Sequence, residues 1–122
     1  MKRLVVLSLS LTLLAGCATT DNLSKYWPRS HDSDLATMFV DAKISIDDLD
    51  CKESFGWDEA THFTRRMSEY AVFRQDPQAD NAKSTLENLK KARLAQNVSS
   101  CDRYLNVVKL RLEVIAKSWG TR

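Results

Sequence analysis

The sequence is poor in the residues that break or bend a chain, since its 122 residues include only three glycines and two prolines. No Asn-Gly or Asp-Gly pair is present to form a tight hairpin, and apolar and polar residues nowhere alternate over the length of a strand. The short length limits the chain to one small domain. The sequence therefore predicts an all-α fold and excludes a large multidomain enzyme.

A clear excess of charge of one sign is also missing. The chain has 18 Lys and Arg against 16 Asp and Glu, and Lys2 and Arg3 at the N-terminus account for the whole difference. A chain balanced in this way lacks the basic surface that nucleic-acid binding needs. We therefore expect no nucleic-acid partner.

Motifs for catalysis or cofactor binding are scarce. The sequence contains no GxSxG, SxxK or CxxCH motif, and its two histidines are His31 and His62. A zinc site needs three or four ligands, whereas the acidic residues near His62, Asp58 and Glu59, fit the first turn of a helix, where negative charge is favourable. We expect a protein without metal or cofactor that is not an enzyme.

The first seventeen residues, MKRLVVLSLSLTLLAGC, have the layout of a secretory signal peptide. A charged pair precedes an apolar stretch of about ten residues, half of the roughly twenty that a helix needs to cross a bilayer. Small residues follow. We therefore expect an exported protein without a permanent transmembrane helix.

The end of this segment, Leu14-Ala15-Gly16-Cys17, resembles the lipobox of bacterial lipoproteins. The alternative is an ordinary signal peptide followed by a chance cysteine. In the lipoprotein family the signal peptide, here residues 1–16, is removed. Cys17 then becomes the first mature residue, with diacylglycerol on its sulfur and a further acyl chain such as palmitate on its amine. The resemblance implies an anchor made of lipid, which several acyl chains would hold stably in a membrane.

Residue 18 is alanine rather than aspartate. In Gram-negative lipoproteins an aspartate at this place commonly marks retention in the inner membrane, so the resemblance implies an outer-membrane anchor with the domain in the periplasm. The same N-terminal layout also fits a surface lipoprotein of a Gram-positive cell.

Residues 17–31 are predicted to form the lipidated N-terminus and a tether, because they are mostly small or polar and show no helical periodicity. Tyr26 and Trp27 are exceptions. They either pack on the domain or lie at the level of the lipid head groups, where amphipathic aromatic rings settle. The folded domain is predicted to span residues 32–122.

From residue 32 the apolar residues recur with a helical period. The pattern predicts helices over 33–50, 59–75 and 78–96 and a fourth that carries its core residues from Cys101 to Trp119. Four helices with short connections predict a small antiparallel four-helix bundle.

Residues suited to helix ends flank these segments. The expected N-caps are Asp or Ser at 32–34, Asp58, and Ser99 or Ser100, and Gly120 is expected to end the last helix. The core stripe of the second helix is expected to run from Ala60 to Phe73.

The cysteines give an independent prediction of topology. If Cys17 carries lipid, Cys51 and Cys101 remain as a pair in an oxidising compartment. Cys51 ends the first predicted helix and Cys101 begins the fourth, and in an antiparallel bundle these two ends meet at one pole. We therefore predict one disulfide; the alternative is two unrelated buried thiols.

The fourth helix has more apolar residues than one buried face requires, because Val107, Leu110 and Val114 stand beside its core set. Either this helix is central in the bundle, or these residues line a groove that accepts the amphipathic helix of a protein partner.

The overall layout resembles the PulS/OutS pilotins of type II secretion. The resemblance is carried by the lipobox at Cys17, Cys51 after the first helix, Gly56-Trp57 before the second and Cys101 at the start of the last. It implies a non-catalytic assembly factor that holds a helix of a secretin subunit and carries it to the outer membrane. Two alternatives are an immunity or superinfection/entry-exclusion lipoprotein that blocks an incoming factor, and a structural envelope protein.

Overall fold

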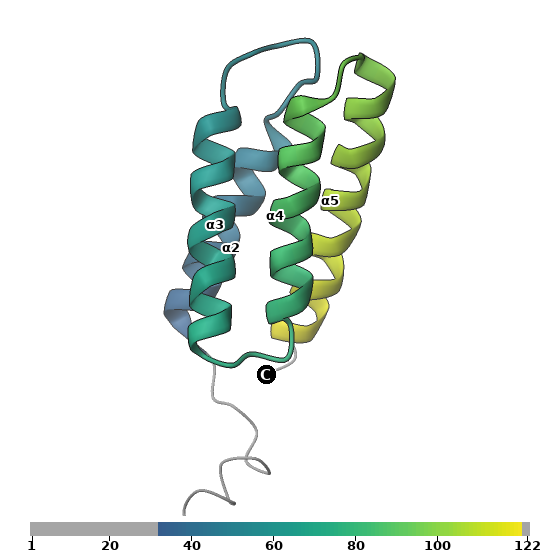
Figure 1. Cartoon of the computed structure of the whole chain (residues 1–122). Helices are drawn as coiled ribbons and strands as arrows, with labels where there is room; N and C mark the ends of the chain where they lie inside the picture. The colour runs from purple at the N-terminus through teal and green to yellow at the C-terminus, as the bar shows by residue number, and fades with distance from the viewer. Residues whose placement is uncertain (1–31, 121–122) are drawn as a thin grey trace, which may run out of the picture.

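The structure is a computed structural model that describes residues 32–120. These residues form four helices: α2 (Ser33–Asp47), α3 (Trp57–Phe73), α4 (Ala79–Leu94) and α5 (Val98–Gly120). No strand occurs among them, and successive helices run in opposite directions (Figure 1). The predicted all-α, antiparallel four-helix bundle is confirmed. The predicted signal peptide and tether lie outside the described residues.

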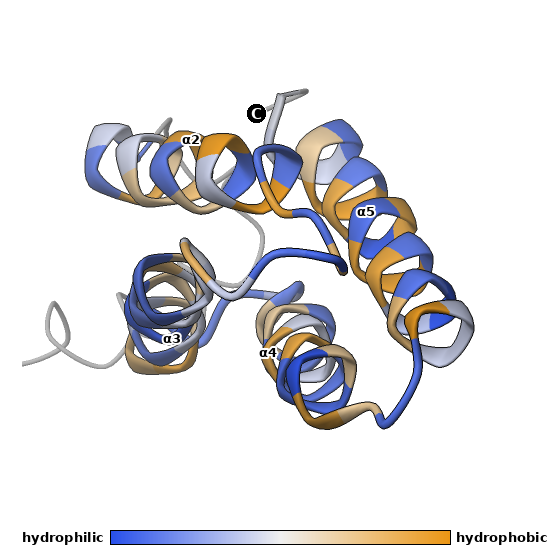
Figure 2. Ribbon diagram, turned by 90° about the horizontal axis from the view of Figure 1, so that it is seen from above, coloured by the Kyte–Doolittle hydropathy of each residue, from blue (hydrophilic) through white to orange (hydrophobic). Residues whose placement is uncertain are grey.

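The four helices form a ring in chain order (Figure 2). Each helix packs against the next one, the contact between α2 and α5 is the smallest, and the diagonal pairs do not meet. We call the end with the loops 48–56 and 95–97 the disulfide pole. The opposite end, with Asp32, the loop 74–78 and Gly120, is the terminal pole (Figure 1).

Most of the bundle core consists of the apolar residues that the helical period selected, and the fold adds buried residues outside that pattern, such as Trp57, Thr64 and Thr85. Ile46, Met67, Leu89 and Ile115 are among the largest side chains that are fully buried, one from each helix. Phe73, predicted as the last core residue of its helix, is 80% exposed. At about 100° per residue, Phe73 lies on the opposite side of α3 from the buried residues, so this prediction is wrong.

Two threonines belong to the buried core. The hydroxyl of Thr64 donates to the carbonyl of Ala60 at 2.7 Å, and that of Thr85 donates to the carbonyl of Asn81 at 2.8 Å. Both side chains are fully buried, and these bonds to the preceding helical turn satisfy hydroxyl donors that would otherwise be costly to bury.

Several helix ends differ from the predicted ones. Asp32 caps α2 as expected, but α2 ends at Asp47 and α3 begins at Trp57. The N-cap of α3 is Gly56, with a positive φ of 84° and no side-chain bond.

The fourth helix also begins earlier than predicted. Its start at Val98 is capped by Asn97, which accepts from the backbone N–H of Ser100 at 2.8 Å, rather than by a serine. Gly120 is the last described residue, so the predicted stop at this glycine is not tested.

Candidate interaction surfaces

The disulfide between Cys51 and Cys101 joins the loop after α2 to the first turn of α5 across 50 residues. The two Cα atoms are 5.9 Å apart, a normal separation for a disulfide. The predicted pairing is confirmed and two unrelated thiols are excluded. The topology explains why the bridge forms, since the end of α2 and the start of α5 lie at the same pole.

Val107, Leu110 and Val114, which we call the α5 stripe, lie together on a face of α5 that does not contribute to the core. Leu110 is 61% exposed, Val114 is 51% exposed and Val107 is half-buried. The helix is one member of a ring (Figure 2), so the alternative of a central helix is excluded. The α5 stripe is therefore not needed for packing within the bundle.

Arg111 lies on the same side of α5 as the stripe and points toward α4. Its Nη1 donates to Oδ1 of Asn81 at 3.2 Å. Its Nε is buried without an acceptor, and no carboxylate among residues 32–120 forms an ion pair with it. The guanidinium thus keeps donor capacity that the described fold does not use.

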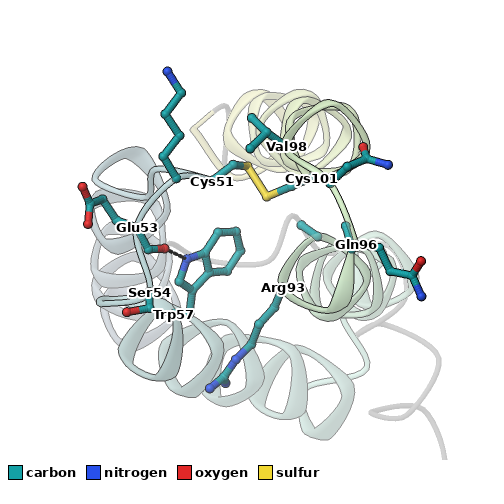
Figure 3. Close-up of a pocket in the computed structure, with 12 residues that line it drawn as sticks. Cys51, Glu53, Ser54, Trp57, Arg93, Gln96, Val98 and Cys101 are labelled. Atoms are coloured by element: carbon teal, nitrogen blue, oxygen red, sulfur yellow. Dashed lines mark hydrogen bonds between the residues drawn. A yellow bond between two sulfur atoms is a disulfide. The ribbon is translucent and has the colours of Figure 1, made fainter.

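A hollow of about 480 Å³ opens at the disulfide pole, between the loop before α3 and the loop before α5 (Figure 3). Its lining combines apolar and polar side chains from both loops and from the helix ends. The lining residues are Cys51, Lys52, Glu53, Ser54, Trp57, Ala92, Arg93, Ala95, Gln96, Asn97, Val98 and Cys101. This hollow was not predicted from the sequence.

Trp57 sits at the base of the hollow, with only 5% of its surface exposed. Its indole N–H donates to the backbone carbonyl of Glu53 at 3.0 Å, so the polar group of the ring is satisfied within the chain (Figure 3). The sequence signal for this arrangement was the pair Gly56-Trp57: the glycine takes the left-handed conformation that turns the loop into α3.

Arg93 borders the hollow from the last turn of α4 and pairs with Asp58 of α3 at 2.6 Å. Asp58 was expected to cap α3, but it lies inside the first turn and serves this ion pair instead. Its side chain is 90% exposed, so solvent screens the pair and leaves it little strength.

The described residues contain no cluster of three or more side chains suited to hold a metal ion. His62 is exposed and its ring lies 5.7 Å from that of Phe63. His31, like Cys17, Tyr26 and Trp27, falls outside residues 32–120. Within that range no helix is both long and apolar enough to span a bilayer.

No protein-family model matches the chain, and neither a curated protein nor a solved structure matches it.

Proposed function

We propose that the chain is a lipid-anchored, non-catalytic assembly factor whose bundle binds the helix of a protein partner at the periplasmic face of the outer membrane. The anchor is the lipid on Cys17 that the lipobox resemblance implies. Several acyl chains, each methylene worth roughly 0.8 kcal/mol when buried, would keep the bundle at the membrane. The bundle would then act only on partners within reach of its tether.

The observation that carries this proposal is the α5 stripe beside Arg111. Two of its three side chains are at least half exposed, although the core of the bundle is complete without them. Val107, Leu110, Arg111 and Val114 follow each other at the spacing of one helical face. A partner helix with a matching apolar face would bury these side chains.

The side chain of Arg111 indicates which residues the partner helix should carry. A guanidinium with no carboxylate partner among the described residues favours a helix that carries Asp or Glu within its apolar face. Because Nε of Arg111 is buried, a carboxylate of the partner would be met by the Nη groups of the guanidinium, and a hydrogen bond between two charged groups is stronger than one between neutral groups. We therefore propose an amphipathic partner helix with an acidic residue placed between its apolar side chains.

The finer proposal is a pilotin-like role, in which the partner helix belongs to a secretin subunit and the lipid brings this subunit to the outer membrane. What supports it is the layout of Cys17, Cys51, Gly56-Trp57 and Cys101 together with the disulfide-linked bundle. An immunity or exclusion role would use the same anchor but would require an incoming toxin, phage or conjugation component as partner.

The anchor is tested by growing cells with radiolabelled palmitate. The label should enter the wild-type protein and be absent from Cys17→Ala. Label in this variant would contradict the lipid anchor at Cys17.

The partner is tested by placing the photo-crosslinker benzoylphenylalanine at Leu110 in living cells, with Glu113 as the matched control. Both positions are exposed on α5, but Glu113 lies about 60° around the helix from Leu110, on the side away from Val107, Arg111 and Val114. An adduct with one envelope protein at Leu110 and not at Glu113 supports the proposal, and its mass identifies the partner. The same adduct at both positions, or none at Leu110, contradicts it, and an adduct with an imported toxin favours the immunity role.

A further inference from the structure

We propose that Phe73, the last residue of α3, enters the head-group region of the membrane to which the chain is anchored and so orients the bundle on its surface. This inference rests on the proposed lipid anchor at Cys17, but it concerns a surface separate from the α5 stripe. The sequence predicts Phe73 in the core, whereas in the structure it is 80% exposed, more than any other large apolar side chain among residues 32–120. Moving such a ring from water into an apolar phase is favourable.

The position of Phe73 favours the membrane as this apolar phase. The hydroxyl of Tyr70 donates to Oδ2 of Asp32 at 3.2 Å, and the rings of Tyr70 and Phe73 have their centroids 6.3 Å apart. Only the side chain of Tyr70 thus separates Phe73 from the residue through which the polypeptide from Cys17 enters the bundle. A tether fixed in the membrane therefore brings the ring of Phe73 close to the lipid.

The next two most exposed apolar side chains lie at the opposite end of the bundle. Leu94 is 79% exposed and Phe55 is 71% exposed, and both belong to the disulfide pole (Figure 1). Cys17 precedes Asp32 by fifteen positions, which span at most about 54 Å when extended. The 23 residues of α5 correspond to a bundle length of about 34 Å. The disulfide pole therefore reaches the membrane only if the tether runs back along the bundle, and the terminal pole needs no such path.

The charges around the exposed phenyl ring nearly cancel. Nε of Arg74 lies 3.3 Å from Oδ2 of Asp32. Asp34 is also near, because its charge, after burial and Asp32, raises the pKa of Tyr70. Arg66 lies two turns earlier on the same face of α3. With two cations and two anions in this region, the attraction to the membrane comes from burial of the ring and not from the charge of the lipid.

A contact through Phe73 requires the bundle to tilt. Side chains of a helix lean toward its N-terminus, so the ring lies at the side of the terminal pole and not at its tip. The edge of α3 then rests on the membrane. Because α5 is diagonally opposite α3 in the ring of helices (Figure 2), the α5 stripe stays clear of the lipid and accessible to a protein partner.

The proposal is tested by ¹⁹F NMR of the lipid-anchored protein, labelled with para-fluorophenylalanine and held in nanodiscs whose phospholipid carries a nitroxide near the head group. The chain has four phenylalanines, and each signal is assigned by replacing one of them with leucine. A nitroxide broadens the signals of nearby nuclei, so the broadening ranks the rings by their distance from the lipid surface. We expect a strongly broadened signal for Phe73 and a sharp signal for Phe55, at low and at high salt.

A matched pair of variants separates the effect of the ring from that of the tether. Phe73→Ser and Leu94→Ser each remove one exposed apolar side chain, from opposite poles. The ring of Phe39, which meets Trp119 at the terminal pole, reports the orientation of the bundle in both variants. Phe73→Ser should lower the population of the oriented state about tenfold, the smaller end of the range for burying a phenylalanine side chain, so that the broadening of Phe39 approaches that of Phe55. Leu94→Ser should keep the wild-type pattern.

Three outcomes would overturn the proposal: a Phe73 signal as sharp as that of Phe55, the same broadening pattern in the two variants, or broadening that disappears at high salt. The first is the outcome if a second copy or a protein partner covers the ring instead of lipid, and the third would make charge the source of the contact. Failure of the lipid anchor is seen separately, as protein that does not remain with the nanodiscs, and it contradicts the anchor and this inference together. Protein that remains bound but keeps a sharp Phe73 signal contradicts this inference alone.

Discussion

The indole N–H of Trp119 donates to Oδ1 of Asp76 at 3.0 Å and so ties the end of α5 to the loop between α3 and α4. Asp76 is buried, and the same oxygen accepts from the backbone N–H of Gln78 at 2.8 Å. The rings of Trp119 and Phe39 of α2 also meet in a T-shaped arrangement, with centroids 5.8 Å apart. One side chain thus connects three parts of the terminal pole, as the disulfide connects two at the other.

Replacing Trp119 by phenylalanine tests this bond. The variant keeps an aromatic ring beside Phe39 but takes one donor from a buried carboxylate. Hydrogen bonds to charged groups are worth about 1.5–3 kcal/mol, and we expect the free energy of unfolding in urea to fall by about this amount. A variant as stable as the wild type would show that the bond contributes nothing.

Removing the disulfide with Cys51→Ala and Cys101→Ala should cost about 4 kcal/mol, because the unfolded chain regains the entropy of a loop of about fifty residues. Urea unfolding of the double variant measures the loss. The wild-type protein unfolded in excess dithiothreitol is the control and should match the variant. A variant that matches the oxidised wild type instead would contradict a stabilising role for the bridge.

Asp32 is expected to be the most important cap of the bundle. Its Oδ1 accepts from the backbone N–H groups of Asp34 and Leu35 at 3.0 and 3.1 Å, and its Oδ2 lies 3.3 Å from Nε of Arg74. Asp32→Ala should lower the free energy of unfolding by about 1–2 kcal/mol. Asp34→Ala, at an exposed position within the first turn of α2, should cost about 0.5 kcal/mol or less; equal losses would contradict the capping role.

The stability of the bundle should decline at alkaline pH through Tyr70. Burial raises the pKa of Tyr70 above its ordinary value of 10.0, and the charge of Asp32 and the hydrogen bond to it raise this pKa further. Above about pH 10 the unfolded chain therefore loses its phenol proton before the folded one, so the free energy of unfolding falls as pH rises.

Tyr70→Phe should make this alkaline decline shallower, as measured by urea unfolding at about pH 9 and about pH 11. The wild-type protein at the same two pH values is the reference. The prediction fails if Tyr70→Phe declines as steeply as the wild type.

Two leucines of α5 allow a buried position and an exposed position of the same helix to be compared. Leu112 is 2% exposed and Leu110 is 61% exposed. Leu112→Ala should cost about 2–5 kcal/mol because it leaves a cavity, whereas Leu110→Ala should change the free energy of unfolding by about 0.5 kcal/mol or less. Similar losses from the two substitutions would mean that the α5 stripe serves the fold and not a partner.

The helices could be read from the sequence because the apolar period is regular over each of them, and α5 shows this most clearly. The ends of the helices could be predicted less accurately. Gly56 is the N-cap of α3 and Asn97 caps α5, although Asp58 and the serines are at least as good caps by residue type. Which candidate acts as the cap depends on how the loops at the disulfide pole are held, and residue type alone does not contain this information.

The sequence by itself determined the helical class, the antiparallel order and the pairing of Cys51 with Cys101, since each follows from local periodicity and from the positions of helix ends along the chain. Only the tertiary structure decided which side chains meet across the bundle. The hollow beside the disulfide, the bond from Arg111 to Asn81 and the bond from Trp119 to Asp76 all join residues from different helices or loops. Such contacts depend on the relative rotation and position of packed helices, and a helical period specifies only which face of each helix turns inward.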